Sequence, residues 1–120
     1  MFLCYHLNIC SYNHANTIPG GTMAPLLETE AAERLAEMFR TLSDPTRLRL
    51  IAALQDGEVN VRQLAAMVGI SESAASHQLR NLRQMRLVRA RRQGREVYYA
   101  LDDEHVLDLF QRGLAHIRHD

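Results

Sequence analysis

The chain has 120 residues, of which 47% are hydrophobic, and its fourteen basic residues balance fourteen acidic ones. A chain of this length forms one globular domain with a modest core, and it has no apolar run long enough to span a membrane as a helix. Its two cysteines, Cys4 and Cys10, both lie near the N-terminus, which excludes a disulfide framework for the rest of the chain.

Residues 1–25 show no hydrophobic period and contain a Pro-Gly-Gly run. We therefore expect a disordered N-terminal arm ahead of a single domain over residues 26–120. The arm lacks the basic start and uninterrupted apolar middle of a secretory signal, so we expect a cytoplasmic protein. Met23 offers a second start of translation, which leaves open whether residues 1–22 are made.

Apolar residues recur at helical spacing in the first part of this domain. They predict one helix over residues 28–42 and a second over residues 45–54. Ser43 or Asp44 can cap the second helix, and Pro45 suits its first position, where the missing N–H costs nothing.

Two further helices are predicted over Val61–Val68 and residues 72–85. Asn60 is placed to cap the first, Gly69 to end it in a left-handed conformation, and Ser71 to cap the second. Two short helices joined by such a turn are typical of a helix-turn-helix, whose second helix enters the major groove of DNA.

The hydrophobic period then changes to the alternation of strands. Residues 87–92 and 96–101 predict a β-hairpin with Gln93, Gly94 and Arg95 at its tip, and a last helix is predicted over residues 103–118. We therefore expect a mainly α protein with a β-hairpin wing, a winged helix-turn-helix fold. A domain this small gains stability as a homodimer.

The basic residues are unevenly placed. All fourteen are arginine, and seven of them lie between Ser73 and Arg95, where no acidic residue occurs. A basic block in a neutral protein indicates a polyanion bound on one face. A solvated helix face is the simpler explanation, but it does not account for the helix-turn-helix and the basic hairpin together.

Polar residues share one side of the helix over residues 72–85. Hydroxyl, imidazole and guanidinium groups can bond base edges or phosphates. The predicted DNA contacts on this helix are Ser73, Ser76, His77 and Arg80. The hairpin would reach the adjacent backbone or minor groove through Arg91, Arg92, Gln93 and Arg95. Affinity should therefore fall steeply with salt.

The last predicted helix carries potential metal ligands at both ends. His105 and His116 are eleven residues apart, or about 16 Å along the axis, which one ion cannot bridge. His116 and His119, at i and i+3, can share an ion. Asp103 and His105 converge only if Asp103 caps the helix.

These pairs are two half-sites. Two copies packed antiparallel would join Asp103 and His105 of one copy to His116 and His119 of the other, giving two sites per homodimer. Three imidazoles and a carboxylate suit tetrahedral Zn²⁺, and Co²⁺ or Ni²⁺ can also bind such a set. The dimer contact would come from an apolar stripe beside them: Val106, Leu109, Phe110, Gly113, Leu114 and Ile117. Any one of these histidines alone is more simply a solvated surface residue.

Three motifs resemble the ArsR/SmtB family of winged-helix repressors. They are SDPTR at residues 43–47, SESAASHQLRNL at 71–82 and RQGREVYYAL at 92–101. The resemblance covers about residues 30–120. It implies a dimer that represses its own detoxification operon by binding operator DNA, expected to be an inverted repeat, until a metal binds.

The same resemblance implies site residues. Ser73, Ser76 and His77 match the family's recognition-helix contacts. The Asp-x-His and His-x-x-His pairs, at Asp103 and at His116, match the C-terminal-helix site of its zinc-sensing members.

The N-terminal arm departs from the family. Its candidate ligands are Cys4, His6, Cys10 and His14. Some relatives pair such an arm with a Cys near the start of the first helix of the motif, where this chain has Asn60 and Gln63. That difference weakens the case for a second, softer-metal site.

Other functions remain open from the sequence. A repressor could respond to redox change through Cys4 and Cys10 without metal, or zinc could serve only to hold a dimer together. A metallohydrolase is disfavoured because all four ligands are used, which leaves no open position for water, so we expect the protein not to be an enzyme.

Overall fold

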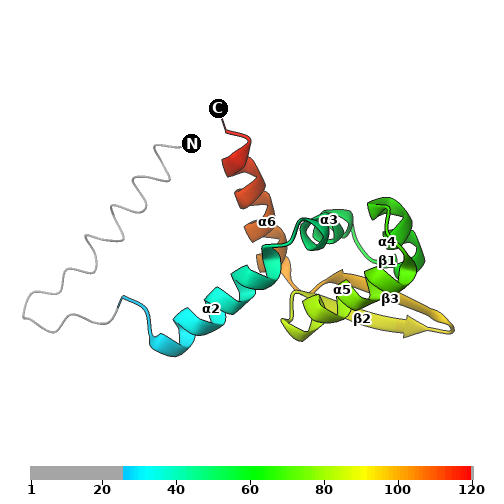
Figure 1. The fold of residues 1–120 in the computed structure, drawn as a ribbon, viewed down its shortest axis with the longest axis horizontal. Coiled ribbons are helices and arrows are strands. Elements are labelled where there is room, and N and C mark those ends of the chain that lie inside the picture. The colour runs from blue at the N-terminus through cyan, green and yellow to red at the C-terminus, as the bar shows by residue number, and fades with distance from the viewer. Residues whose placement is uncertain (1–25, 120) are drawn as a thin grey trace, which may run out of the picture. The chain divides into compact units, whose positions relative to one another are not determined.

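The computed structural model describes residues 26–119. Its elements are α2 (Thr29–Leu42), α3 (Pro45–Ala53), β1 (Val59–Asn60), α4 (Val61–Val68), α5 (Glu72–Gln84), β2 (Val88–Gln93), β3 (Glu96–Leu101) and α6 (Glu104–Ile117) (Figure 1). All predicted helices and both hairpin strands are present, within a residue of their expected bounds. The predictions for residues 1–25 lie outside the described part. Residues 26–32 belong to a separate unit, and the features below lie in the unit that begins at Glu33.

Local hydrogen bonds fix the ends of the helices. Four helices begin at a side chain that accepts from the backbone N–H three residues on: Asp44, Asn60, Ser71 and Asp103. Asp44, rather than Ser43, caps α3, with its Oδ2 2.9 Å from the Arg47 nitrogen. Gly69 ends α4 at a φ of +78°, in the left-handed region that glycine tolerates.

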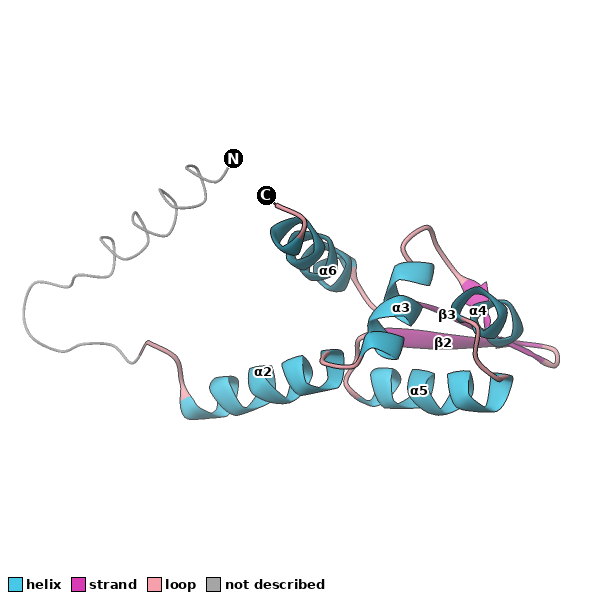
Figure 2. Cartoon of the chain, turned by 45° about the horizontal axis from the view of Figure 1, so that its top comes forward, coloured by secondary structure: helices cyan, strands magenta, loops and turns pink. Residues whose placement is uncertain are grey.

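The wing has one strand more than predicted. β1 pairs antiparallel with β3, and β2 pairs with the other edge of β3, which gives the order β1-β3-β2. Figure 2 shows the wing strands β2 and β3 together with the helices around them. β1 is only two residues long and runs directly into α4. Two residues are too few to show an alternating pattern, so the sequence predicted only a hairpin.

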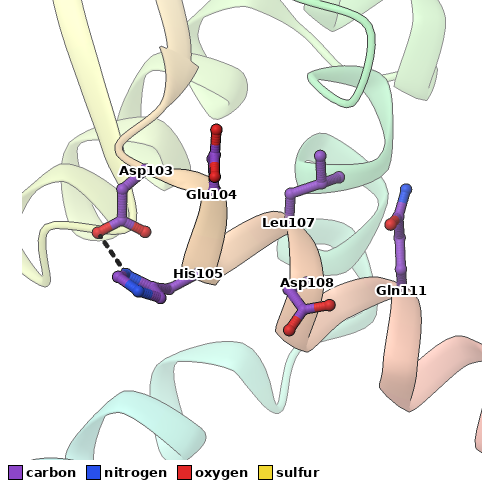
Figure 3. A pocket seen from close by; sticks show the side chains of 6 residues that line it. All are labelled: Asp103, Glu104, His105, Leu107, Asp108 and Gln111. Atoms are coloured by element: carbon purple, nitrogen blue, oxygen red, sulfur yellow. Dashed lines mark ion pairs between the residues drawn. The ribbon is translucent and has the colours of Figure 1, made fainter.

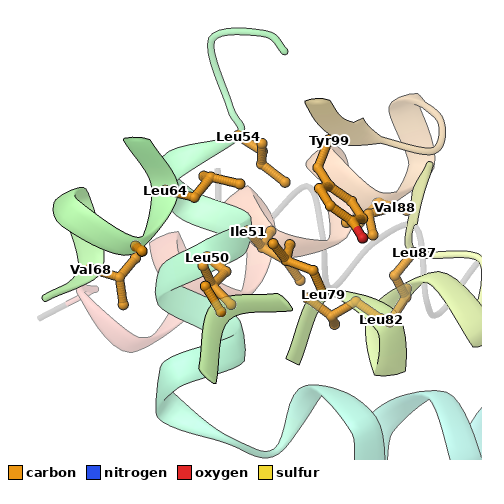
Figure 4. Close-up of a cluster of buried hydrophobic side chains, with 13 residues drawn as sticks. Leu50, Ile51, Leu54, Leu64, Val68, Leu79, Leu82, Leu87, Val88 and Tyr99 are labelled. Carbon is orange, nitrogen blue, oxygen red and sulfur yellow. The ribbon is translucent and has the colours of Figure 1, made fainter. Parts of the chain in front are cut away.

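A single hydrophobic core joins the helices to the wing (Figure 4). Its largest fully buried side chains are Leu50, Ile51, Leu54, Leu64, Leu79, Leu82, Leu87 and Val88. Tyr99 reaches this core from β3 and Val106 from α6. The fold is therefore the predicted winged helix-turn-helix, mainly helical, with a three-stranded antiparallel wing. Among the described residues no helix is long and apolar enough to cross a membrane.

Replacing Gly69 with alanine should lower the free energy of unfolding by about 1–2 kcal/mol, since an L side chain strains the left-handed conformation. A Cβ there would meet nothing within 4 Å, so the backbone alone is tested. Gly69→Asn is the matched variant and should lose less, because asparagine tolerates this region. Urea denaturation measures both, and equal losses would contradict the explanation.

Candidate DNA-binding face and metal-ligand pairs

The core decides which side of α5 faces outward. Ala75, Leu79 and Leu82 are fully buried, as predicted. On the opposite side Ser73, His77 and Arg80 are exposed, while Ser76 is half-buried. The Nε of Arg80 donates to the Ser76 carbonyl oxygen at 3.3 Å, which lays this guanidinium along the helix. The four predicted contacts on α5 thus share one accessible side.

Arg47, whose role the sequence did not suggest, joins α5 to the end of α2 through side-chain hydrogen bonds. Its Nε donates to Gln78 Oε1 at 2.7 Å, and its Nη1 donates to the carbonyl oxygen of Thr41 at 3.0 Å. One half-buried side chain therefore links the end of α2, the first turn of α3 and the middle of α5. The only sequence signal was its place in the SDPTR motif.

The tip of the wing presents the other predicted DNA contacts. Arg92, Gln93 and Arg95 are exposed around Gly94, whose φ of +61° makes the turn. Within residues 26–119, neither Arg92 nor Arg95 pairs with a carboxylate, so both charges are available to an anion.

Arg91 is placed differently from its neighbours. Its Nη2 lies 2.6 Å from Glu58 Oε1, and its Nε donates to both carboxylate oxygens, at 3.2 and 3.0 Å. This hydrogen-bonded pairing lowers the pKa of Glu58 below its ordinary value and raises that of Arg91. The structure thus joins Arg91 to a carboxylate that precedes β1.

Asp103 and His105 converge at the start of α6 (Figure 3). Asp103 is the N-cap, and its Oδ1 accepts from the Val106 amide at 3.2 Å. Its Oδ2 lies 3.4 Å from Nδ1 of His105, whose side chain is 95% exposed. The Val106 hydrogen bond, and after it the contact with His105, holds the pKa of Asp103 below its ordinary value. The carboxylate is therefore ionised and accessible at neutral pH.

The separation of these two donors fits a shared ion. Two ligand atoms each about 2.0 Å from a tetrahedral Zn²⁺ lie about 3.3 Å apart. The 3.4 Å between Oδ2 and Nδ1 is close to that value. Oxygen and nitrogen donors are also the types that Zn²⁺, Co²⁺ and Ni²⁺ accept.

The second pair lies at the other end of α6. The helix ends at Ile117, Arg118 is its C-cap, and the His119 N–H donates to the His116 carbonyl at 3.3 Å. This hydrogen bond continues the coil past Ile117, so His116 and His119 lie about one turn apart. Both side chains are exposed.

A single copy does not assemble all four residues. Among residues 26–119 no group of three His, Cys, Asp or Glu side chains is close enough to hold one ion. This agrees with the length of α6, which has fourteen residues and so keeps the two pairs about three turns apart.

An apolar groove runs along α6 beside these pairs. Its walls are Phe39, Leu42, Leu48, Ile51, Val106, Leu109, Phe110, Gly113, Leu114 and Ile117. Phe39 is 50% exposed and Ile117 is 76% exposed. One member of the predicted stripe differs, because Val106 is only 8% exposed and belongs to the protomer's own core.

Comparison with known proteins gives consistent matches. A model of bacterial regulatory proteins of the arsR family matches residues 44–90. The transcriptional repressor SmtB homolog of Synechocystis is 48% identical over 93 residues, which are 78% of this chain and 70% of the relative. The regulator NmtR of Mycobacterium tuberculosis is 39% identical and covers 78% of each chain.

A solved structure agrees with the fold. It is a homodimeric winged helix-turn-helix DNA-binding domain from Mycobacterium bovis, with a TM-score of 0.70 and 31% identity, covering 80% of this chain and 91% of that one.

The chain belongs to the ArsR/SmtB family of metal-sensing transcriptional repressors. The resemblance stated from the three motifs is thereby confirmed. ArsR/SmtB proteins are transcriptional regulators, so the prediction that the chain is not an enzyme is confirmed as well. The matched residues 44–90 span α3 to the first residues of β2 and stop before α6. The metal ligands therefore stay a prediction.

Replacing Asp103 with asparagine keeps a cap for α6 but removes the charge. Because folding lowers the pKa of Asp103, the ionised carboxylate stabilises the fold above its unfolded pKa, and this stability is lost as pH falls through the folded pKa. The metal-free protein should be more stable than D103N at neutral pH, and the two should converge below about pH 4. Chemical denaturation across this range measures the difference. A constant gap down to about pH 3 would contradict the assignment.

Proposed function

We propose that the protein is a homodimeric repressor that binds operator DNA through α5 and the wing and releases it when Zn²⁺, or Co²⁺ or Ni²⁺, binds between the two copies of α6. The observation that carries the proposal is the pairing of Asp103 with His105 at 3.4 Å, at the opposite end of α6 from His116.

The DNA-binding part rests on the two accessible surfaces described above. Ser73, His77 and Arg80 lie on the outward side of α5, with Ser76 beside them, and these groups can bond base edges or phosphates in a major groove. Arg92, Gln93 and Arg95 at the wing tip would contact neighbouring backbone. The relative from M. bovis is a DNA-binding domain of the same fold, which supports this assignment.

The dimer part rests on the apolar groove. Exposed Phe39, Leu48 and Ile117 together form an apolar surface that a monomer in water would leave uncovered. A second copy related by a two-fold axis would bring the same surface to cover it. The homodimeric state of the M. bovis relative favours the same partner. Two identical copies would bind a DNA site that is itself an inverted repeat.

The metal part rests on the donors of α6. Asp103 and His105 of one copy, with His116 and His119 of the other, would supply one oxygen and three nitrogen ligands. A bound divalent ion would contribute only charge and coordination geometry, because a four-ligand site leaves no open position for chemistry. The chain's own residues orient the proposed pair at the start of α6. The Val106 amide donates to Asp103, and the His105 side chain lies in contact with the same carboxylate.

A structural route connects α6 to α5. α6 contacts α3, and α3 contacts α5, while Arg47 ties the first turn of α3 to Gln78 on α5. Fixing the two α6 helices against each other would therefore shift α3, and with it the two DNA-reading helices. By linkage, DNA must weaken metal binding by the same factor, commonly about 1–3 kcal/mol.

Replacing His116 with alanine should leave DNA affinity intact and abolish metal-driven release, because one ligand pair is broken while α5 and the wing are untouched. Fluorescence anisotropy on the protein's own promoter, with Zn²⁺, Co²⁺, Ni²⁺ and Cd²⁺ added in turn, measures the effect. Gln111→Ala, at another exposed position of α6, is the control and should respond like the unchanged protein. Release of H116A by zinc would mean that the site is assigned wrongly.

Ile117→Arg tests the dimer surface. Ile117 is 76% exposed in the protomer, so the charge should not disturb the fold of one copy but should destabilise an apolar dimer contact. Sedimentation should show a shift toward monomer at equal concentration. Met67→Arg is the matched control, since Met67 is 58% exposed on α4 and lies outside the groove. If M67R dissociates the dimer and I117R does not, the interface lies elsewhere.

A further inference from the structure

Arg91 reaches across the whole wing sheet. It lies on β2 opposite Tyr98 of β3, which in turn lies opposite Asn60 of β1. Glu58 directly precedes β1, and its carboxylate accepts from Arg91 on the far side of β3. The Arg91–Glu58 ion pair therefore spans all three strands, with Tyr98 beneath it.

The guanidinium of Arg91 is engaged on several sides. Nε and Nη2 donate to Glu58, Nη1 donates to Gln93 Oε1 at 2.7 Å, and the Cζ atom lies 4.9 Å from the centre of the Tyr98 ring. All three nitrogens thus have an acceptor, and one face of the group lies on an aromatic ring. The fork of Nε and Nη2, which could otherwise bind a phosphate in a bidentate manner, is therefore occupied by a carboxylate.

Arg92, the next residue of β2, differs from Arg91 in having no carboxylate partner among the described residues. It pairs with Val97 across the hairpin and points to the other face of the sheet. Neither Arg92 nor Arg95 pairs with a carboxylate within residues 26–119. Of the three arginines nearest the wing tip, one is therefore neutralised and two keep an uncompensated charge. Arg89, at the other end of β2, donates to the carbonyl oxygen of Asp102 at 3.4 Å.

We propose that Arg91 is a positioning residue: with Glu58 and Tyr98 it clamps the three strands of the wing, and the wing's ionic contacts with DNA are made by Arg92 and Arg95. This inference rests on the proposed DNA-binding function. It removes Arg91 from the DNA contacts expected from the sequence and gives Glu58 a role that the sequence did not suggest. The clamp stiffens the hairpin, while Glu58 keeps the charge of Arg91 from the phosphates.

The salt dependence of DNA binding separates a clamp from a contact. A plot of the logarithm of the association constant against the logarithm of the salt concentration has a negative slope. Each phosphate contact makes this slope steeper by about 0.9, whatever the DNA sequence. Arg91→Gln should leave this slope unchanged, even if a looser wing lowers the affinity. Arg92→Gln and Arg95→Gln, the matched controls, should each reduce it by about 0.9. Fluorescence anisotropy with a mixed-sequence duplex at several salt concentrations gives the slopes.

Glu58→Gln gives an independent test that keeps Arg91 in place. Freed from its carboxylate, Arg91 should become available to phosphate, and the slope should steepen by about 0.9. The double variant E58Q/R91Q should return to the slope of the unchanged protein. A loss of slope in R91Q equal to that in R92Q, or no steepening in E58Q, would overturn the clamp. If the unchanged protein itself bound the duplex without salt dependence, the proposed function would fail instead.

Discussion

One hydrophobic core decides which side of each helix is available for binding. α5 buries Ala75, Leu79 and Leu82 in it, so the side that carries the predicted DNA contacts is the accessible one. α6 fully buries Val106 alone. Its histidines therefore lie outside the core, and its apolar stripe stays partly exposed, most of all at Ile117. Both surfaces therefore depend on the same packing. α3 lies in contact with both helices and is the element through which a change at one can reach the other.

The length of α6 is the second constraint. A helix of fourteen residues is rigid on the scale of a metal site, and its two ends cannot approach each other. Each end holds a pair of proposed ligands, and a pair is too few to satisfy an ion. A dimer in which the two helices run in opposite directions resolves this, because it brings unlike ends together. Binding the effector and fixing the dimer would then be the same event.

The sequence predicted the features that depend on local hydrogen bonds. Asn60 and Ser71 cap helices through the amide three residues on, and Gly69 ends one through its own backbone. Asp103 also caps a helix, a role expected from the sequence only as the condition for Asp103 and His105 to converge. Features that join distant residues were not predictable in this way. Arg91 and Glu58 are 33 positions apart, and Arg47 and Gln78 are 31 apart. No short sequence pattern, such as a helical period or a capping motif, connects residues so far apart. The two-residue strand β1 depends on a partner about forty positions further along, for the same reason.

Mixed dimers test most directly whether two copies share each site. One subunit would carry Asp103→Ser and His105→Gln, where serine keeps the cap of α6, and the other would carry His116→Gln and His119→Gln. The two would be co-expressed with different tags and purified through both. A site shared between opposite ends of α6 predicts one bound Co²⁺ or Zn²⁺ per mixed dimer and none in either parent homodimer. A mixed dimer that binds no ion would contradict a shared site, since each copy then needs both of its own pairs.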